Sequence, residues 1–307
     1  MFKKGWFIIT LMKSGLSIII PVYNEEQIIL PTLRSLIQGL KKAKLKFEII
    51  VVNDGSTDET AALLKKSRLK FQLISYQKNK GYGAALKTGI KQSQYPVIAI
   101  TDADGTYPHQ RLSEFYQILK KNNLDLISGA RIGKNVQIPL LRRLPKWCLN
   151  QFANFVVRDQ VPDVNCGLRV YRKKALLPFF SLLPNGFSFT ATSLLAMMAS
   201  DYQVSFKKIN YFNRKGKSKI NPIKDTINFF KLVFKIGLYF APLKVFLPIS
   251  ILVLALGLIW GLVSWQYFGH FADASTLMFI LTSLQLTALA LLAELINKRL
   301  PNIYQKL

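Results

Sequence analysis

The sequence predicts an α/β fold with a doubly wound sheet, followed by a C-terminal part that lies in a membrane. Two observations support this prediction. Short β-branched runs alternate with amphipathic segments from residue 16 to residue 128, a pattern typical of strands and helices in such a sheet. Two apolar runs, residues 245–265 without any charge and residues 276–296 with Glu294 near one end, are each close to the ~20 residues that cross a bilayer.

Strands and helices are expected in alternation through the first part of the chain. The run Leu-Ser-Ile-Ile-Ile-Pro-Val that begins at Leu16 suits a strand buried on both faces of a parallel sheet. We expect further strands at residues 47–52, 71–76, 97–101 and 126–128, and helices at about residues 27–44, 57–67, 84–92 and 112–122. Between residues 139 and 186 the periodicity weakens, and we expect loops and short helices there.

The C-terminal part is predicted to be a membrane anchor of two helices, residues 243–307. An amphipathic helix at the membrane interface, residues 226–242, is expected before it, because Lys231 and Lys235 interrupt an apolar stretch. Residues 266–275 hold no Lys or Arg, whereas Lys244 and Lys298 flank the two runs. The positive-inside rule therefore places the α/β domain, residues 15–225, on the cytoplasmic side of the plasma membrane if the cell is prokaryotic.

The first residues, 1–14, are interpreted as a tail, since their apolar run lacks the cleavage site of a signal peptide.

The alternative for the two apolar runs near the C-terminus is a pair of buried helices in a soluble core. Two long apolar runs in tandem, with Glu294 as their one charged residue, argue against that alternative.

The balance of charge calls for anionic partners. The chain has 42 Lys and Arg against 16 Asp and Glu, a formal net charge of +26. The cations are spread from Lys41 to Arg299 and thicken before the apolar runs, which favours a membrane surface and membrane lipids over nucleic acid. Cys148 and Cys166 are far apart, so neither a disulfide framework nor a zinc knuckle is indicated.

The strongest local feature is Asp102-Ala103-Asp104, at the end of a predicted buried strand and before Gly105. Two carboxylates two residues apart can share a hard cation such as Mg²⁺ or Mn²⁺, which keeps its other positions for water and substrate phosphates. An isolated triplet of this kind is more often a solvated turn. Its position after a strand favours the metal site, because ligands bind beyond the carboxyl ends of such strands.

Two further polar clusters follow predicted strands. Asn53-Asp54-Gly55-Ser56 offers a carboxylate to a ribose or base and a glycine turn where backbone can approach a ligand. Tyr23-Asn24-Glu25 follows the first strand in the same way. Three polar clusters at strand ends predict one binding edge.

These motifs resemble the family 2 glycosyltransferases with the GT-A fold, a Rossmann-like nucleotide-sugar transferase domain. The resemblance covers about residues 16–219 and is strongest to the dolichyl- or undecaprenyl-phosphate mannosyl- and glucosyltransferases. It rests on Ile20-Pro21-Val22-Tyr23-Asn24-Glu25, Asp54-Gly55-Ser56, Asn79-Lys80-Gly81, Asp102-Ala103-Asp104-Gly105, Gly129-Ala130-Arg131, Asp163-Val164-Asn165-Cys166-Gly167-Leu168-Arg169 and Arg214-Lys215-Gly216-Lys217-Ser218-Lys219.

The resemblance implies roles for these positions. The nucleotide-sugar would contact Pro21, Tyr23, Glu25, Asp54, Lys80 and Asp102, and a Mg²⁺ or Mn²⁺ ion would be held by Asp102 and Asp104. The diphosphate and the acceptor phosphate would contact Arg131, Arg169, Arg214, Ser218 and Lys219. Arginine offers phosphate a planar bidentate fork, which agrees with these roles. Catalytic roles are implied for Asp104, Asp163 and Arg131.

The sequence departs from the family at residues 186–192, Gly-Phe-Ser-Phe-Thr-Ala-Thr, where many members carry acidic residues. A carboxylate base in this segment is therefore not expected. A polyprenyl phosphate is already an anion at neutral pH and needs little proton removal, so electrostatic positioning could supply most of the catalysis. Asp163 is the candidate for the remaining base or orienting role.

Gly81-Tyr82-Gly83 lacks the third glycine of a dinucleotide loop and is interpreted as a turn that shapes the donor pocket.

The expected function is inverting transfer of a hexose from a nucleotide-sugar, of the GDP-mannose or UDP-glucose type, to polyprenyl phosphate. One alternative is a processive polysaccharide synthase, although the Gln-x-x-Arg-Trp motif of those enzymes is absent from the sequence. Another is a catalytically inactive membrane protein that binds nucleotide-sugar. The sugar, the nucleotide, the lipid length and whether the chain forms homo-oligomers stay open.

Overall fold

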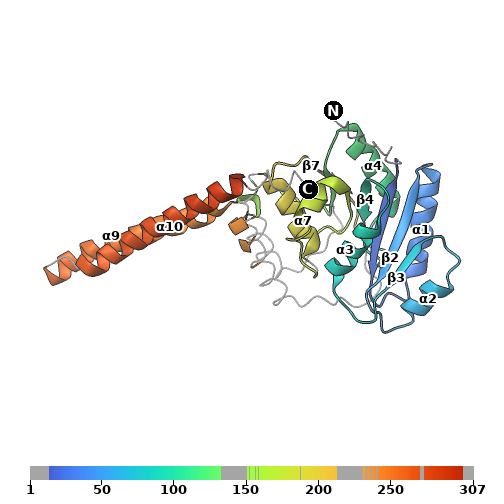
Figure 1. Ribbon diagram of the computed structural model, residues 1–307, viewed down its shortest axis with the longest axis horizontal. Helices are drawn as coiled ribbons and strands as arrows, with labels where there is room; N and C mark the ends of the chain where they lie inside the picture. The colour runs from blue at the N-terminus through green and yellow to red at the C-terminus, as the bar shows by residue number, and fades with distance from the viewer. Residues whose placement is uncertain are drawn as a thin grey trace, which may run out of the picture. The chain divides into compact units, whose positions relative to one another are not determined.

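The computed structural model describes residues 14–132, 159–186, 188–212, 241–269 and 273–299, with some of residues 151–157 and 231–239. Two compact units make up the chain, one built on the sheet and one holding the two long C-terminal helices (Figure 1). The predicted tail and most of the predicted interfacial helix lie outside the described residues.

The elements expected between residues 16 and 128 are all present in the expected order, with ends that differ by up to three residues. The strands are β1 Leu16–Val22, β2 Phe47–Asn53, β3 Gln72–Ser75, β4 Val97–Ile100, β5 Leu126–Ala130, β6 Arg169–Arg172 and β7 Val204–Lys208. The helices of this unit are α1 Ile29–Lys42, α2 Thr60–Lys66, α3 Tyr82–Gln92, α4 Leu112–Lys121, α6 Lys173–Leu176 and α7 Phe189–Ala199, with 3-10 turns η1 His109–Arg111 and η3 Leu177–Phe179.

The seven strands form one mixed sheet in the order β3-β2-β1-β4-β6-β5-β7. Strands β1, β2, β3 and β4 are parallel, as predicted, whereas β6 runs antiparallel to β4 and β5. The expectation of only loops and short helices at residues 139–186 is wrong at β6. Its sequence, Arg-Val-Tyr-Arg, lacks a strong apolar pattern, and its place is decided by pairing with strands distant in sequence.

Helices cover both faces of the sheet. On one face, Leu33 of α1 and Phe115 of α4 pack in one buried cluster with Ile18 of β1. On the other face, Ile19 of β1 packs so closely against Gly89 of α3 that no Cβ would fit there. Figure 1 shows α1 and α3 on opposite sides of the strands. The buried sheet is therefore a rigid support for the loops at its edges.

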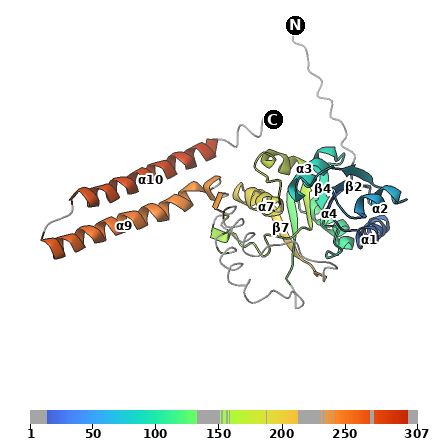
Figure 2. The same cartoon turned by 90° about the horizontal axis from the view of Figure 1, so that it is seen from below.

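The second unit contains a helical hairpin made of α9 Pro242–Phe268 and α10 Asp273–Arg299. Two segments, Pro242–Phe268 and Ala274–Ile296, are long and apolar enough to span a membrane, and only 22% and 11% of their apolar windows are buried. Both views show the helices side by side (Figure 2). The predicted spans fall inside these helices.

Small and hydroxylated side chains hold the hairpin together. Ser250 of α9 bonds to Ser283 at 3.0 Å and to Thr287 at 2.7 Å, and Gly257 leaves room for Phe279. Close approach through small residues and hydrogen bonds between hydroxyls are typical of helices that pack within a bilayer.

Candidate active site

The carboxyl ends of the central parallel strands define one edge of the sheet. Val22 of β1 pairs with Asn53 of β2, and Ile19 of β1 pairs with Ile100 of β4. Because β6 is antiparallel, it begins at this edge, with Arg169 opposite Ile100. The three polar clusters predicted from the sequence therefore meet at this edge, as we expected. The antiparallel course of β6 brings the loop before it to the same edge.

The loops after β1 and β2 are joined to each other by hydrogen bonds. The backbone N–H of Asn24 donates to Ser56 at 3.0 Å, and the N–H of Thr57 donates to the side chain of Asn24 at 2.8 Å. The N–H of Glu25 donates to Thr60 at 2.9 Å. These bonds fix half-buried Tyr23 and Glu25 at the edge, whereas Pro21 is buried within β1.

Asp54 orders the turn that precedes α3. Its carboxylate accepts the backbone N–H groups of Lys80 at 2.7 Å and Gly81 at 3.0 Å, and the residue is only 3% exposed. The ammonium of Lys80 lies 4.5 Å from the ring centroid of Tyr76, and Lys80 is exposed. Asp54 thus acts on the turn through its backbone, and Lys80 presents its charge near the edge.

Asp102 and Asp104 follow β4 and are both partly exposed, while Ala103 between them is buried. The phenol of Tyr82, the first residue of α3, donates to Oδ1 of Asp102 at 2.9 Å. Burial and the charge of Asp102 raise the pKa of Tyr82 well above its usual value, so this phenol stays protonated. Oδ1 of Asp104 accepts both the N–H of Thr106, at 3.1 Å, and its hydroxyl, at 2.7 Å.

This pair of carboxylates suits a hard divalent cation. Among the described residues no three His, Cys, Asp or Glu side chains gather as a metal cluster. A Mg²⁺ or Mn²⁺ ion needs no more than one or two carboxylates when substrate phosphates complete its coordination. Asp102 and Asp104 therefore fit an ion that binds together with a phosphorylated substrate.

Arg131, just after β5, forms an ion pair with Asp163. Its Nε lies 2.7 Å from Oδ2 of Asp163 and its second guanidinium nitrogen 3.0 Å from Oδ1. The Arg131 side chain is 20% exposed and that of Asp163 only 2%. Burial alone disfavours a charged guanidinium, but the bonds to Asp163 outweigh it and raise the pKa of Arg131. The guanidinium also lies 5.1 Å from the ring centroid of Tyr211.

Arg169 is placed differently from Arg131. It is fully buried, and its guanidinium donates to the backbone carbonyls of Cys166, Val164 and Thr190. A buried side chain with these partners holds the loop before β6 against α7, a position that does not favour the phosphate contact expected from the sequence. The other implied phosphate ligands, Arg214, Ser218 and Lys219, lie outside the described residues.

The hydroxyl-rich segment that departs from the family pattern is largely internal. Thr190 is 4% exposed and Thr192 3%. The hydroxyl of Thr192 donates to the carbonyl of Ser188 at 2.8 Å, and that of Ser193 donates to the carbonyl of Thr190 at 2.9 Å. These buried hydroxyls therefore donate to backbone carbonyl groups at the start of helix α7.

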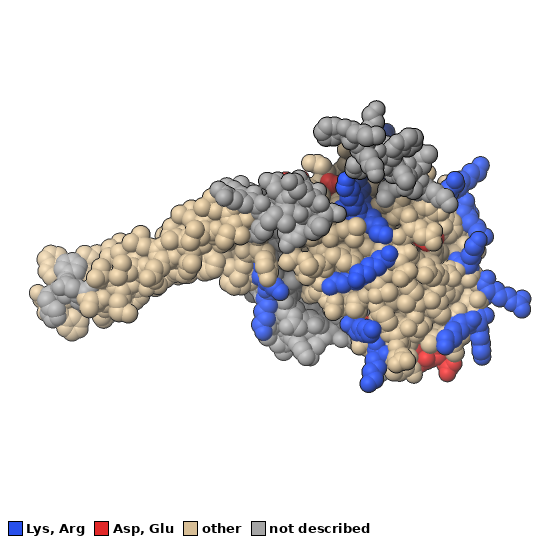
Figure 3. Space-filling view, in the orientation of Figure 1, with Lys and Arg blue, Asp and Glu red and all other residues tan. Residues whose placement is uncertain are grey.

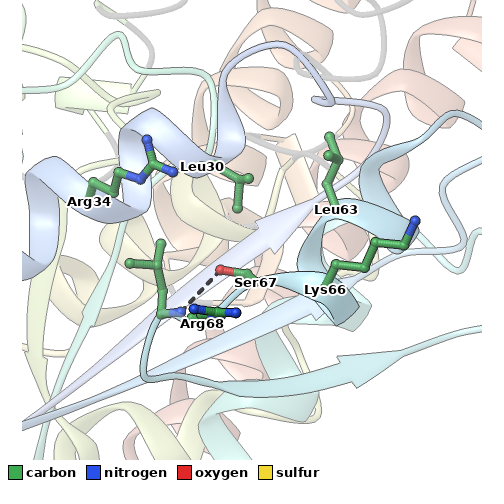
Figure 4. Close-up of a pocket in the computed structure, with 7 residues that line it drawn as sticks. Leu30, Arg34, Leu63, Lys66, Ser67 and Arg68 are labelled. Atoms are coloured by element: carbon green, nitrogen blue, oxygen red, sulfur yellow. Dashed lines mark hydrogen bonds between the residues drawn. The ribbon is translucent and has the colours of Figure 1, made fainter.

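A separate groove of about 400 Å³ lies beside α1 and α2 (Figure 4). Its apolar surface comes from Leu30, Leu63 and Leu69, and Arg34, Lys66, Ser67 and Arg68 complete its lining. None of these residues belongs to the loops that follow β1, β2 and β4 at the carboxyl edge. The groove is therefore not part of the candidate active site.

The chain matches two family models. The model described as glycosyl transferase family 2 covers residues 17–178, and the model described as the GtrB C-terminal hairpin covers residues 241–298.

Several curated proteins are similar to this chain. A dolichyl-phosphate hexose transferase of Haloferax volcanii is 28% identical over 67% of this chain and 87% of its own length. An undecaprenyl-phosphate 4-deoxy-4-formamido-L-arabinose transferase of Pseudomonas fluorescens is 28% identical over 92% of this chain and 85% of its own. The match to a dodecaprenyl-phosphate galacturonate synthase of Rhizobium johnstonii is 29% identical over 51% of this chain and spans about half of that protein, 47%.

Solved structures show the same fold. Glucosyl-3-phosphoglycerate synthase from Mycobacterium tuberculosis in complex with UDP superposes with a TM-score of 0.55 at 15% identity, covering 77% of this chain and 86% of that one. The same enzyme with Mn²⁺, UDP-glucose and phosphoglyceric acid has a TM-score of 0.51 at 17% identity, covering 76% and 85%. The fold expected from the motifs is confirmed, and the chain belongs to glycosyl transferase family 2.

Proposed function

We propose that this protein is a membrane-bound, inverting glycosyltransferase that moves a hexose from a nucleotide-sugar to the phosphate of a polyprenyl phosphate. The observation that carries the proposal is the pair Asp102 and Asp104 at the carboxyl edge of a glycosyltransferase sheet. The same chain has two helices that can span a membrane and that match the family model of the GtrB C-terminal hairpin. The names of the relatives support the class of acceptor, since they describe dolichyl, undecaprenyl and dodecaprenyl phosphates.

The nucleotide-sugar is proposed to bind along the edge formed by the loops after β1, β2 and β4. Tyr23 and Glu25 contact the nucleoside, together with the turn that Asp54 orders. Lys80 and the Asp102–Asp104 pair lie at the diphosphate end. A Mg²⁺ or Mn²⁺ ion held by Asp102 and Asp104 would neutralise the charge of the leaving nucleoside diphosphate.

Arg131 is proposed to contact the acceptor phosphate. Guanidinium carries five N–H donors, so the pair with Asp163 leaves it able to bind phosphate oxygens as well. Asp163 orients Arg131 and is not needed as a base, because the lipid phosphate is already an anion. An oxygen of the lipid phosphate attacks the anomeric carbon, and the bond from that carbon to the nucleoside diphosphate breaks. Holding the two substrates in this arrangement lowers the barrier.

The α/β domain is proposed to face the cytoplasm. Nucleotide-sugars are soluble anions, and the positive-inside rule places the cationic flanks of the hairpin on that side. The identity of the sugar is set by the donor pocket and is to be read from experiment.

A panel of labelled nucleotide-sugars, offered with Mg²⁺ or Mn²⁺ and polyprenyl phosphate to the purified full-length protein, tests the proposal. We expect one donor to give a lipid-linked product bearing a single sugar. The Asp104→Asn variant should lose at least about 100-fold in rate, because electrostatic stabilisation of charge in the transition state is lost.

Asp201→Asn is a matched control, because Asp201 is exposed and its φ of 60° is a conformation that Asn tolerates. A long polymer as product would favour the synthase alternative. Binding of a nucleotide-sugar without any transfer, in wild type and variant alike, would favour the inactive binding protein.

A further inference from the structure

Tyr82 stands between two glycines whose positions the proposed reaction does not explain. A Cβ at Gly81 would come within 2.5 Å of the carbonyl oxygen of Asn185, and a Cβ at Gly83 within 2.9 Å of the carbonyl oxygen of Gly186. The φ of Gly81 is 102°, which disfavours residues with a side chain. The backbone at residues 184–186 therefore closes directly onto the start of α3.

That contact fixes the direction of the Tyr82 side chain. The N–H of Ala84 donates to the carbonyl of Asn185 at 3.0 Å, and Lys87 donates to the side chain of Asn185 at 3.0 Å. The first turn of α3 is thus attached to a second segment, and its first residue is aimed at Asp102, where the phenol donates to Oδ1 at 2.9 Å.

The other side of the Asp102 carboxylate is also occupied. A Cβ at Gly167 would lie 2.6 Å from Oδ2, so only a glycine lets the carboxylate sit there. The N–H of Gly167 donates to the hydroxyl of Tyr107 at 2.8 Å, which holds this backbone in place. Asp102 is therefore confined between a phenol donor and a fixed stretch of backbone.

We infer that Tyr82 is a positioning residue for the metal ligand Asp102, and that the two glycines beside it serve to deliver its phenol. The inference rests on the metal site of the proposed function. Partners that hydrogen-bond to a metal ligand orient it, and their loss typically lowers metal affinity about 10- to 100-fold. In this role Tyr82 acts through Asp102.

The test measures binding of Mn²⁺ to the full-length protein in detergent by electron paramagnetic resonance, with UDP in one series and GDP in another. Tyr82→Phe removes only the hydroxyl and should raise the dissociation constant of Mn²⁺ at least about 10-fold. In an Asp102→Asn background the same change should have little further effect, because the two residues act as one unit.

Tyr76→Phe is the matched control. Its hydroxyl donates to Ala84 at 3.2 Å and bonds to Thr88 at 2.5 Å, so the variant loses bonds on the same helix without touching Asp102. We expect its affinity for Mn²⁺ to stay within about twofold of wild type, since no partner of the metal ligand is removed.

The inference is overturned if Tyr82→Phe binds Mn²⁺ as tightly as wild type, if Tyr76→Phe weakens binding equally, or if the wild-type protein binds no Mn²⁺ with either nucleotide. The assay contains neither sugar nor lipid. Absence of transfer would therefore remove the proposed function and leave this inference standing, whereas equal Mn²⁺ affinities would do the reverse.

Discussion

The sheet unit and the helical hairpin distribute apolar and polar side chains in opposite ways. In the sheet unit Ile18 and Ile20 are fully buried. In the hairpin Leu252 and Leu256 are 60% and 49% exposed, while the hydroxyl of Ser250, only 2% exposed, lies inside. The sheet unit is therefore suited to water and the hairpin to a lipid environment. A large exposed apolar surface is stable where its surroundings are themselves apolar.

Charge follows the same division. Figure 3 shows Lys and Arg side chains spread over the sheet unit on the visible face, while most of the visible surface of the two long helices is neither Lys, Arg, Asp nor Glu. Lys244 is the one charged residue of α9. The described cations of the sheet unit therefore suit contact with water and anions, whereas the hairpin suits an apolar environment.

The largest expected effect comes from placing a charge on the hairpin. Leu256→Arg puts a cation near the middle of α9, which costs about 2.5–3.5 kcal/mol of insertion free energy if the helix spans a membrane. Leu177→Arg makes the same change at a residue of the sheet unit that is 43% exposed, where we expect a normal yield. Alkaline extraction of membranes measures the difference, and equal retention of both variants would rule out α9 as a span.

The next effect tests the catalytic edge. Gly167→Ala forces a methyl group into the carboxylate of Asp102, and a displacement of about 1 Å near reacting groups can cost about 100-fold in rate. Gly186→Ala is the control, because a Cβ there meets no atom within 4 Å. Initial rates of transfer compare the two, and an unchanged rate in Gly167→Ala would show that the position of Asp102 is unimportant.

A smaller effect depends on pH. His109 is 4% exposed, and burial lowers its pKa to about 4. The unfolded chain therefore binds a proton on His109 near pH 6.5, whereas the folded protein binds it only near pH 4. The free energy of unfolding therefore decreases as the pH is lowered from about 6.5 to 4, by at most about 1.4 kcal/mol per pH unit.

Thermal unfolding in detergent at pH 6.5 and 5.5 measures this effect. His109→Gln should show a smaller fall in the unfolding midpoint than wild type over the same interval. Parallel falls in both proteins would mean that other groups dominate acid destabilisation.

The smallest effect concerns hydroxyls inside the hairpin. Ser250→Ala removes bonds to Ser283 and Thr287 and should weaken helix pairing by about 0.6 kcal/mol, the typical value for such bonds within a membrane. Thr282→Ala, at an exposed position on α10, should have no measurable effect. A disulfide-exchange or energy-transfer assay measures the pairing of α9 with α10 in the full chain for both variants. Equal pairing in Ser250→Ala and Thr282→Ala would mean that packing alone holds the helices together.

Much of this organisation could be predicted from local patterns. The strand beginning at Leu16, the position of Asp102 and Asp104 after β4, and the two apolar runs each follow from residues adjacent in sequence. Strands β6 and β7 could not be predicted in this way. β6 is short and flanked by arginines, and β7 is an edge strand with two lysines, so neither carries a strong periodic signal.

The roles of individual side chains divided along the same line. Sequence alone determined the fold class, the sheet edge at which the polar clusters meet and the two long apolar helices, because hydrophobic periodicity and residue type at strand ends are local properties. Only the tertiary structure showed that Arg169 is buried among backbone carbonyls while Arg131 pairs with Asp163, and that Tyr82 reaches Asp102. These facts depend on contacts between segments far apart in the chain, and no spacing along the sequence encodes them.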